Sequence, residues 1–350
     1  MSPAKDGKIK NINGSEFRQD LVSGDWILVA AKRAKRPHRR IKRVRLNSSK
    51  KNCPFDDPQL NGAPGPLLWL PHPATKNYKL KTKNLSKDWW VQIVPNKFPA
   101  LEPHATCPIE VADGPYAKMD GAGFHEIIIT RDHRRRIAEM TPEEVEALLY
   151  AYQDRYRTLA REKCIQYILI FHNQGPSAGA TLFHPHSQLI ALPIIPPDVS
   201  KSLEGSRVYY EKNKKCAHCA MIKWEAKKGE RVIYENDKFI VIEPFAPRVS
   251  YETRIFPKRH AGNFDDLSAA ERISLADVMI VSLKKIKKAM NDPDYNFFIH
   301  TAPTKDGAGY YHWHIEILPK TSTWAGLELG TGIEVVAVSP ENAAKELKKH

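Results

Sequence analysis

The sequence predicts an α+β protein built from two copies of one structural unit. Three observations lead to this prediction: two long helices with the same capping signal, strand-rich segments on both sides of each helix, and a pair of histidines that closes each copy. A chain of 350 residues exceeds the size at which a single hydrophobic core usually stops growing, so we expect two domains.

Each predicted helix begins at a capping box. Thr141 and Glu144 open the first, with Pro142 at the first helical position, and apolar residues then recur on one face. Ser268 and Glu271 open the second helix in the same way. Strand candidates flank both helices, and they cover residues 125–133, 165–173, 251–260 and 295–301.

Histidine spacing agrees between the copies. The matched intervals are His172 to His186 and His300 to His314, fourteen positions each, and His133 to His184 and His260 to His312, fifty-one and fifty-two positions. This agreement indicates an internal duplication, with a first domain at 1–197 and a second at 198–350. The polar stretch 198–215 is interpreted as the linker between them.

The histidine pairs indicate a metal-binding or catalytic site. Alternation along a strand points His184 and His186 to one face, as a metal half-site or a catalytic pair. The preceding loop, 173–183, is rich in small residues whose backbone N–H groups approach phosphate oxygens closely. The corresponding loop 301–311 lacks that density towards its end, so the second copy is expected to be catalytically silent.

Composition narrows the class of protein. The net charge is +14, and residues 31–51 contain eleven Lys or Arg in twenty-one positions. This stretch is interpreted as a nucleic-acid-binding arm, a solvated loop, or a binding site for the phosphates of a small nucleotide. Five dispersed cysteines favour metal sites or free thiols in a reducing cytoplasm over a disulfide framework. Neither a membrane span nor a secretory signal is visible.

Zinc ligands are suggested in both copies. Zinc is usually bound by four Cys or His ligands, often starting from a Cys-x-x-Cys pair. The second copy offers such a set in Cys216, Cys219, His260 and His312. The first offers Cys53, His133 and His184, with Asp56 or Asp57 as the fourth ligand; alternatively this site has been lost.

The motif HPHSQ, with NQGPSAGA upstream and ALPIIPP downstream, resembles the nucleotidyltransferase branch of the histidine-triad superfamily, typified by galactose-1-phosphate uridylyltransferase. The resemblance extends to 17–37, 94–101 and 326–332. It implies duplicated histidine-triad-like units, with antiparallel sheets and one long helix per half packed on them. It also implies a homodimer with shared active sites, which acts on a nucleotide sugar and a sugar 1-phosphate rather than on nucleic acid or a membrane.

The resemblance assigns roles to residues. It makes His186 the nucleophile, and Gln188 stands where hydrolytic relatives carry a third histidine. Residues that match the family's substrate contacts are Arg33, Arg36, Asn96, Asn173, Gly179, Ala180, Thr181, Gln188, Glu328 and Gly330. The last two are expected to reach the sugar across a subunit boundary.

Three functions follow from these patterns. The first is uridylyl transfer between UDP-glucose and galactose 1-phosphate, in galactose metabolism, through a covalent intermediate on His186. The second is adenylyl transfer from an ADP-sugar to phosphate by the same intermediate. The third, from another class, is a nucleic-acid- or nucleotide-binding module that uses residues 31–51. The sequence gives neither the base preference nor the physiological sugar.

Overall fold

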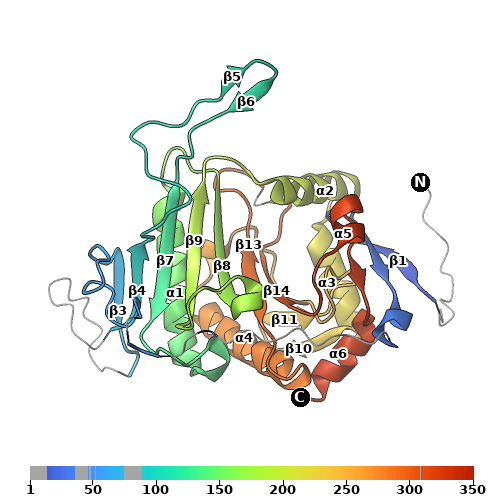
Figure 1. Ribbon diagram of the computed structural model, residues 1–350. Coiled ribbons are helices and arrows are strands. Elements are labelled where there is room, and N and C mark those ends of the chain that lie inside the picture. Colours follow the sequence, from blue (N-terminus) through green and yellow to red (C-terminus); the bar gives the residue numbers. More distant parts are fainter. Residues whose placement is uncertain (1–13, 36–45, 47–48, 52, 75–88, 308) are drawn as a thin grey trace.

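A ten-stranded antiparallel sheet forms the centre of the protein (Figure 1). The structure is a computed structural model that describes residues 14–35, 46, 49–51, 53–74, 89–307 and 309–350. Within these residues the strands lie in the order β10 (Val232–Glu235), β11 (Phe239–Ile242), β12 (Thr253–Pro257), β14 (His314–Pro319), β13 (Tyr295–His300), β8 (Tyr167–Gln174), β9 (His186–Leu192), β7 (Phe124–Thr130), β4 (Trp89–Pro95) and β3 (Leu68–Pro71).

The predicted duplication is confirmed by this strand order. Read outward from the middle, the first half runs β8, β9, β7, β4, β3 and the second runs β13, β14, β12, β11, β10. The two series have the same connectivity, and β8 and β13 pair antiparallel at the centre. The two halves therefore share one continuous sheet.

Both capping boxes form as predicted. Helices α1 (Pro142–Ala160) and α4 (Ala269–Ala289) begin after Thr141 and Ser268, whose side chains accept from the backbone N–H of Glu144 and Glu271. The two helices contact each other and pack on one face of the sheet. Their apolar sides join strands from both halves in one large buried cluster. The two helices leave the opposite face of the sheet available for a functional site.

Smaller elements surround this core. A three-stranded sheet joins β1 (Glu16–Gln19), β2 (Trp26–Val29) and β15 (Val335–Val336), and a hairpin of β5 (Val111–Asp113) and β6 (Tyr116–Lys118) projects from the body (Figure 1). The remaining helices are α2 (Pro197–Asn213), α3 (Ala217–Lys228), α5 (Gly326–Thr331) and α6 (Pro340–Lys348), with 3-10 turns η1 (Ala31–Lys35), η2 (Ile137–Glu139), η3 (Pro176–Ala178) and η4 (Phe264–Asp266).

Most of the stretch 198–215, interpreted as the linker, forms the helix α2, which follows β9 of the first half and precedes the strands of the second. Gly205 has a packing role in this helix. A Cβ built at Gly205 would lie 1.8 Å from the carbonyl oxygen of Val22. The helix therefore approaches the N-terminal turn as closely as a backbone without a side chain permits.

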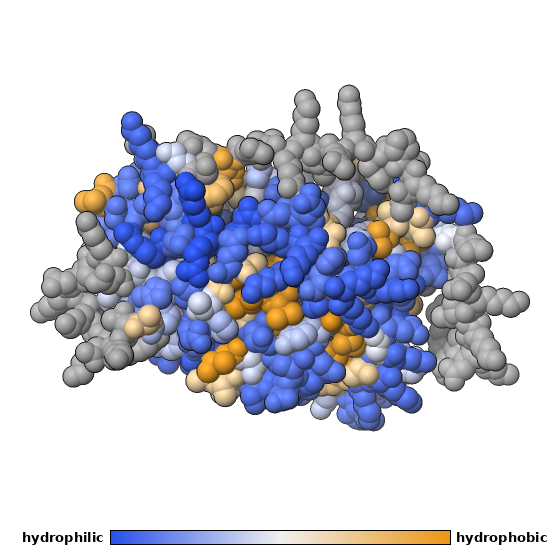
Figure 2. Space-filling model, turned by 90° about the horizontal axis from the view of Figure 1, so that it is seen from below, coloured by the Kyte–Doolittle hydropathy of each residue, from blue (hydrophilic) through white to orange (hydrophobic). Residues whose placement is uncertain are grey.

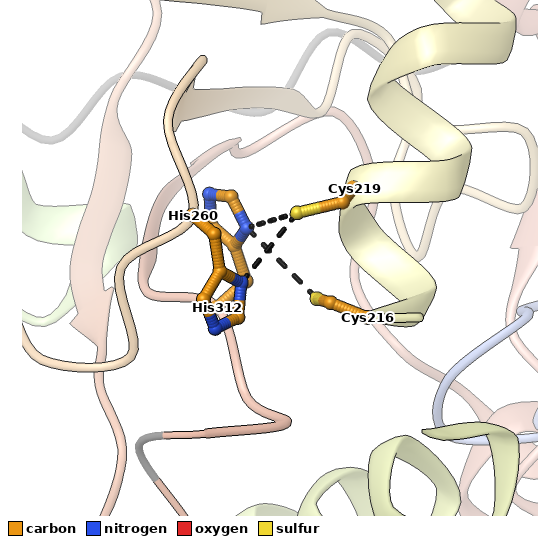
Figure 3. Close-up of side chains that lie close together, drawn as sticks. All are labelled: Cys216, Cys219, His260 and His312. Carbon is orange, nitrogen blue, oxygen red and sulfur yellow. Dashed lines mark hydrogen bonds between the residues drawn. The ribbon is translucent and has the colours of Figure 1, made fainter. Parts of the chain in front are cut away.

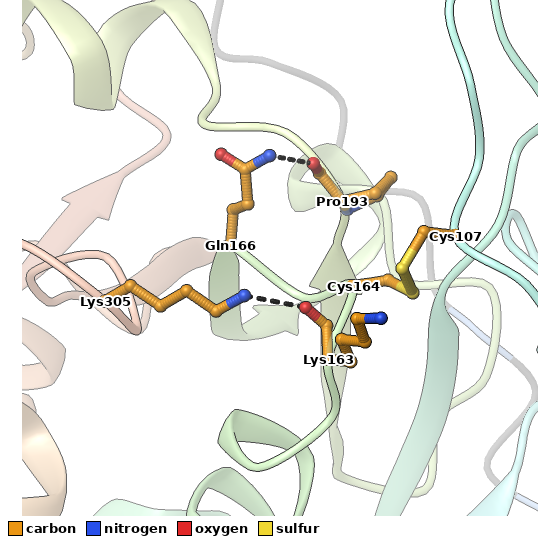
Figure 4. Close-up of a disulfide and its surroundings, with 6 residues drawn as sticks. All are labelled: Cys107, Lys163, Cys164, Gln166, Pro193 and Lys305. Carbon is orange, nitrogen blue, oxygen red and sulfur yellow. Dashed lines mark hydrogen bonds between the residues drawn. A yellow bond between two sulfur atoms is a disulfide. The ribbon is translucent and has the colours of Figure 1, made fainter.

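The prediction that all cysteines are thiols or metal ligands was wrong. Cys107 and Cys164 form a disulfide that ties the segment before β5 to the connection between α1 and β8 (Figure 4). Beside it, Lys305 of the second half donates to the backbone carbonyl of Lys163 at 2.7 Å. The two cysteines are fifty-seven positions apart, and nothing in their local sequence marked them as a pair.

His172 and His300 each lie fourteen positions before the second histidine of a pair, His186 and His314. This equal spacing does not make them equivalent in the folded structure. His172 pairs with Ser187, whereas His300 pairs with His314. Because side chains alternate between faces, this one-residue difference turns His172 to the helix side, where its Nδ1 lies 3.0 Å from the hydroxyl of Ser187. Asn173 takes the position that His300 has in the second half.

The surface is largely hydrophilic on the face turned to the viewer in Figure 2, with small, separate hydrophobic patches. Within the described part of the chain, every helix is too short or too polar to cross a membrane. Most of the basic run, residues 36–45 and 47–48, lies outside the described residues.

Candidate active site and metal sites

His186 lies at the start of β9, on the face of the sheet opposite the long helices. Ser187 and Leu189 face the helices, so the alternation of the strand turns His186 and Gln188 the other way. The strand begins only at His186, and so the prediction that His184 belongs to it was wrong. The same holds for the second pair, where β14 begins at its second histidine.

The ring of His186 is held in one orientation. Its Nδ1–H donates to the backbone carbonyl of His184 at 2.9 Å, which leaves the lone pair on Nε2 for chemistry. Burial lowers the pKa of His186, whose exposed fraction is only 9 %. A neutral imidazole with a free Nε2 is the form that attacks an electrophile.

Gln188 is oriented by a histidine that sequence reasoning missed. The backbone N–H of Ala100 donates to Nδ1 of His125 at 3.0 Å, so the proton of this ring is on Nε2. That Nε2–H donates to Oε1 of Gln188 at 2.8 Å. The amide NH₂ of Gln188 is then the end available to donate to a ligand oxygen. Asn96 joins the group, with its Nδ2 3.1 Å from Nε2 of His125.

The small-residue loop forms a turn that the second half holds in place. Gly175 and Gly179 both adopt positive φ, at 84° and 88°, on either side of η3. A side chain at Gly175 would collide with Asp294, whose carboxylate accepts from the backbone N–H of Ser177 at 2.8 Å. Asp294 precedes β13, so an acidic residue of the second half supports the loop of the first.

Asn173 is positioned by the same neighbouring strand. Nδ2 of Asn296, on β13, donates to Oδ1 of Asn173 at 2.7 Å and to the carbonyl oxygen of Ala178 at 2.8 Å. Of the other residues matched to the loop, Ala180 is buried and Thr181 is exposed. Asn296 and Asp294 could not be found from sequence, because the signal for them is the pairing of β13 with β8 across the two halves.

The four predicted zinc ligands of the second half come together (Figure 3). Their ligand atoms all lie within 4.8 Å of one another. Cys216 and Cys219 come from the start of α3, and His260 and His312 approach from the sheet side. The Nε2–H of His312 donates to the carbonyl oxygen of Pro257 at 3.0 Å, so its Nδ1 faces the cysteines.

Electrostatics at this set suit a metal. A hydrogen bond from Cys219 lowers the pKa of the Cys216 thiol and raises that of Cys219, so the pair shares one proton. Burial lowers the pKa of His312 and favours the neutral ring. A Cys₂His₂ set that contains a thiolate and the neutral ring of His312 fits structural zinc.

The corresponding set in the first half also forms, and it includes Asp56 rather than Asp57. Cys53, Asp56, His133 and His184 bring their ligand atoms within 4.8 Å of one another. His133 Nδ1 lies 2.9 Å from the Asp56 carboxylate, and His184 Nδ1 lies 3.6 Å from the sulfur of Cys53. Asp57 instead lies 3.6 Å from Arg131. The set fits a divalent metal with one oxygen ligand.

Both sets orient their histidine in the same way. His184 Nε2–H donates to the carbonyl oxygen of Thr130 at 2.7 Å, as His312 does to Pro257. Thr130 and Pro257 are the last residues of β7 and β12, which are equivalent strands of the two halves. Burial of Cys53 raises the pKa of its thiol, so this cysteine resists ionisation more than Cys216 does.

The second copy differs from the first at the residue beside its strand histidine. His314 repeats the ring orientation, with Nδ1–H donating to the carbonyl oxygen of His312 at 3.1 Å. Its Nε2, however, lies 3.4 Å from the carboxylate of Glu316, which stands where the first half has Gln188. A fixed negative charge beside Nε2 repels a phosphate.

The remaining predicted substrate residues come from other segments of the chain. Arg33 is exposed in η1, and Arg36 lies outside the described residues. Glu328 and Gly330 are in α5, and Glu328 lines a cavity of the second half. That Glu328 and Gly330 reach the sugar across a subunit boundary stays a prediction from the resemblance.

Comparison with known proteins places this arrangement in a family. Residues 7–196 match the model of the galactose-1-phosphate uridyl transferase N-terminal domain, and residues 114–350 match a domain of unknown function (DUF4921). The chain is 33% identical to an ADP-glucose phosphorylase of Arabidopsis thaliana, over 98% of this chain and 95% of the relative. It is 29% identical to a galactose-1-phosphate uridylyltransferase of Thermotoga maritima, over 95% and 98%.

Solved structures agree with this placement. The crystal structure of an ADP-glucose phosphorylase from Arabidopsis thaliana with bound ADP-glucose superimposes with a TM-score of 0.79 at 32% sequence identity, over 96% of this chain and 99% of that one. The matched domain model covers more than half of the chain and includes His186 and Gln188. The chain therefore belongs to the galactose-1-phosphate uridylyltransferase family of nucleotidyltransferases.

Proposed function

We propose that the protein transfers a nucleoside monophosphate from a nucleotide sugar to an acceptor through a covalent intermediate on His186. The observation that carries this proposal is the buried, neutral ring of His186, whose Nδ1–H is bound to the carbonyl oxygen of His184. The lone pair on Nε2 attacks the α-phosphorus, the bond from phosphorus to the bridging oxygen breaks, and the sugar 1-phosphate leaves as an anion.

In the second half-reaction an oxygen of the acceptor attacks the same phosphorus, and Nε2 of His186 is the leaving group. Gln188 donates from its amide to a non-bridging oxygen in both steps, because His125 holds its carbonyl end. The loop between Gly175 and Gly179 supplies backbone N–H groups for the remaining phosphate oxygens. Asn173, Ala180 and Thr181 flank that loop.

Adenylyl transfer from an ADP-sugar to inorganic phosphate is the form of the reaction that the comparisons favour. It rests on the relative with 33% identity over nearly the whole chain, which is an ADP-glucose phosphorylase. The second candidate is uridylyl transfer from UDP-glucose to galactose 1-phosphate, favoured by the family model and by the relative with 29% identity.

The test is labelling of the protein with radioactive ADP-glucose or UDP-glucose in the absence of an acceptor. An acid-labile, base-stable label is expected on the wild-type protein and on His314→Ala, and none on His186→Ala. Label from ADP-glucose that phosphate releases supports the phosphorylase, and label from UDP-glucose that galactose 1-phosphate releases supports the uridylyltransferase. Equal labelling of His186→Ala would disprove the covalent mechanism.

We further propose that zinc has a structural role here. The set of Cys216, Cys219, His260 and His312 would hold it in the second half, and the set of Cys53, Asp56, His133 and His184 in the first. Bound zinc supplies cross-links between distant segments. In the first half such a cross-link fixes His184, whose carbonyl oxygen orients the ring of His186.

A further inference from the structure

One segment of the first half projects from the body of the protein, and we call it the arm. It comprises residues 103–120 and includes the hairpin of β5 and β6 (Figure 1). The two ends of the arm meet at its base, where the backbone N–H of Gly123 donates to the carbonyl oxygen of Glu102 at 2.9 Å. The base is therefore held by backbone hydrogen bonds that do not involve the arm itself.

Beyond its base, the arm is fixed to the body by the disulfide. Its other polar contacts in the described part of the chain are internal, namely the pairing of β5 with β6 and the ion pair of Lys118 with Asp113 at 2.8 Å. Every residue of the arm is exposed except Cys107 and Pro108, which are half-buried. The bond from Cys107 to Cys164 thus decides whether the arm has a fixed position.

Both cysteines of this disulfide line a cavity of about 600 Å³ between the arm and the body. The volume lies within the range of about 300–1,000 Å³ that is typical of small-molecule sites. Cys164 is half-buried, as Cys107 is, so neither cysteine is enclosed by the core. Thiol–disulfide exchange requires that a thiolate reach one of the two sulfurs, and exposed disulfides are therefore the ones that exchange readily.

The charged side chains of the cavity indicate which kind of thiol it accepts. Lys163 and Lys305 contribute two ammonium groups, and Glu110 and Asp306 contribute two carboxylates. A ligand with charges of both signs finds opposite partners in this set, whereas a polyanion or a polycation would meet two like charges. Residues 193–195 add an apolar wall of one proline and two isoleucines. A small peptide thiol combines these properties.

We propose that the Cys107–Cys164 disulfide is an exchange site for a small peptide thiol with ammonium and carboxylate groups, and that exchange releases the arm. A peptide thiolate attacks one sulfur, the S–S bond breaks, and the other cysteine leaves as a thiolate. A second peptide thiolate then attacks the peptide sulfur of the mixed disulfide. Both cysteines are thereby reduced and take up the two thiol protons, and two peptide thiols are oxidised to one disulfide. The site does not use His186, so it is independent of the proposed transfer reaction.

The experiment treats the full-length, zinc-supplied protein with reduced glutathione and then with trypsin. Lys118, the last residue of β6, is the cleavage site, because a protease cuts a segment faster once it is free to unfold locally. Glutathione is expected to speed this cleavage five-fold or more in the wild type, and intact-mass measurement should show the opened disulfide. The variant with both Cys107→Ser and Cys164→Ser is the control. It should be cut at the fast rate without glutathione and show no change with it.

Recognition of the peptide is tested by mass measurement of the rate at which the disulfide opens. At equal thiolate concentration, 2-mercaptoethanol should open it at least five-fold more slowly than glutathione does. Lys163→Gln should reduce this advantage of glutathione, while the matched control Lys118→Gln, an exposed lysine outside the cavity lining, should retain it. Any of three results would overturn the proposal: no opening by millimolar glutathione, equal rates with the two thiols, or cleavage at Lys118 that opening leaves unchanged.

Discussion

Replacing both Cys107 and Cys164 with serine is expected to destabilise the protein strongly. The disulfide closes a loop with a sequence separation of 57 residues. In the chain-entropy model, a loop of that length is worth about 4 kcal/mol at 25 °C, because the cross-link restricts the unfolded chain. For a chain of this size, about 4 kcal/mol corresponds to a fall of about 5 °C in the melting temperature.

The assay is urea unfolding of the wild type and the double variant, with zinc supplied to both. Reductant is expected to lower the unfolding free energy of the wild type to that of the variant and to leave the variant unchanged. A thiol reagent should find three reactive cysteines in the unfolded, chelated wild type, namely Cys53, Cys216 and Cys219. Five reactive thiols, or a stability difference below about 1 kcal/mol, would refute the reasoning.

The remaining predictions concern the site, the metals and pH. His125→Phe is expected to lower kcat about 10- to 100-fold and to leave KM nearly unchanged, because Gln188 loses the donor that orients it. A larger effect on KM than on kcat in steady-state assays would contradict this. Cys216→Ser should remove one equivalent of zinc per chain, measured by elemental analysis, while His300→Ala should retain it. Burial lowers the pKa of His172 from 6.5 to about 3, so the neutral ring contributes stability above pH 6.5 that is lost as pH falls towards 3. The fall in urea midpoint over that window should be smaller in His172→Asn, and an identical fall would exclude His172 as its source. Since burial also lowers the pKa of His186, labelling by the nucleotide sugar should remain constant from pH 8 to 6.5 and decrease only at lower pH.

The elements that the sequence predicted well depend on local signals. Capping boxes at Thr141 and Ser268 placed the two long helices, because their donors and acceptors lie within three residues of each other. The histidine pairs and the Cys-x-x-Cys motif placed the metal ligands of the second half. The recurrence of the histidine pairs in both halves revealed the duplication, which requires no knowledge of tertiary contacts.

Other features depend on contacts between segments that are distant in the chain. Only the folded structure shows that Cys107 meets Cys164, and that Gly205 lies in a helix pressed against Val22. Asn296 supports the proposed phosphate loop solely because β13 pairs with β8, more than a hundred residues away in sequence. Such partners carry no local pattern.

Register is the clearest case of what the sequence left open. Equal spacing made His172 and His300 look equivalent, but an offset of one residue between the two strand pairs puts them on opposite faces. Side chains alternate with a period of two, so a single-residue shift decides whether a histidine is buried under a helix or lines a cavity. Sequence alone determined the repeated unit and its candidate site residues. Tertiary structure decided which faces these residues share, because that depends on strand pairing and not on spacing along the chain.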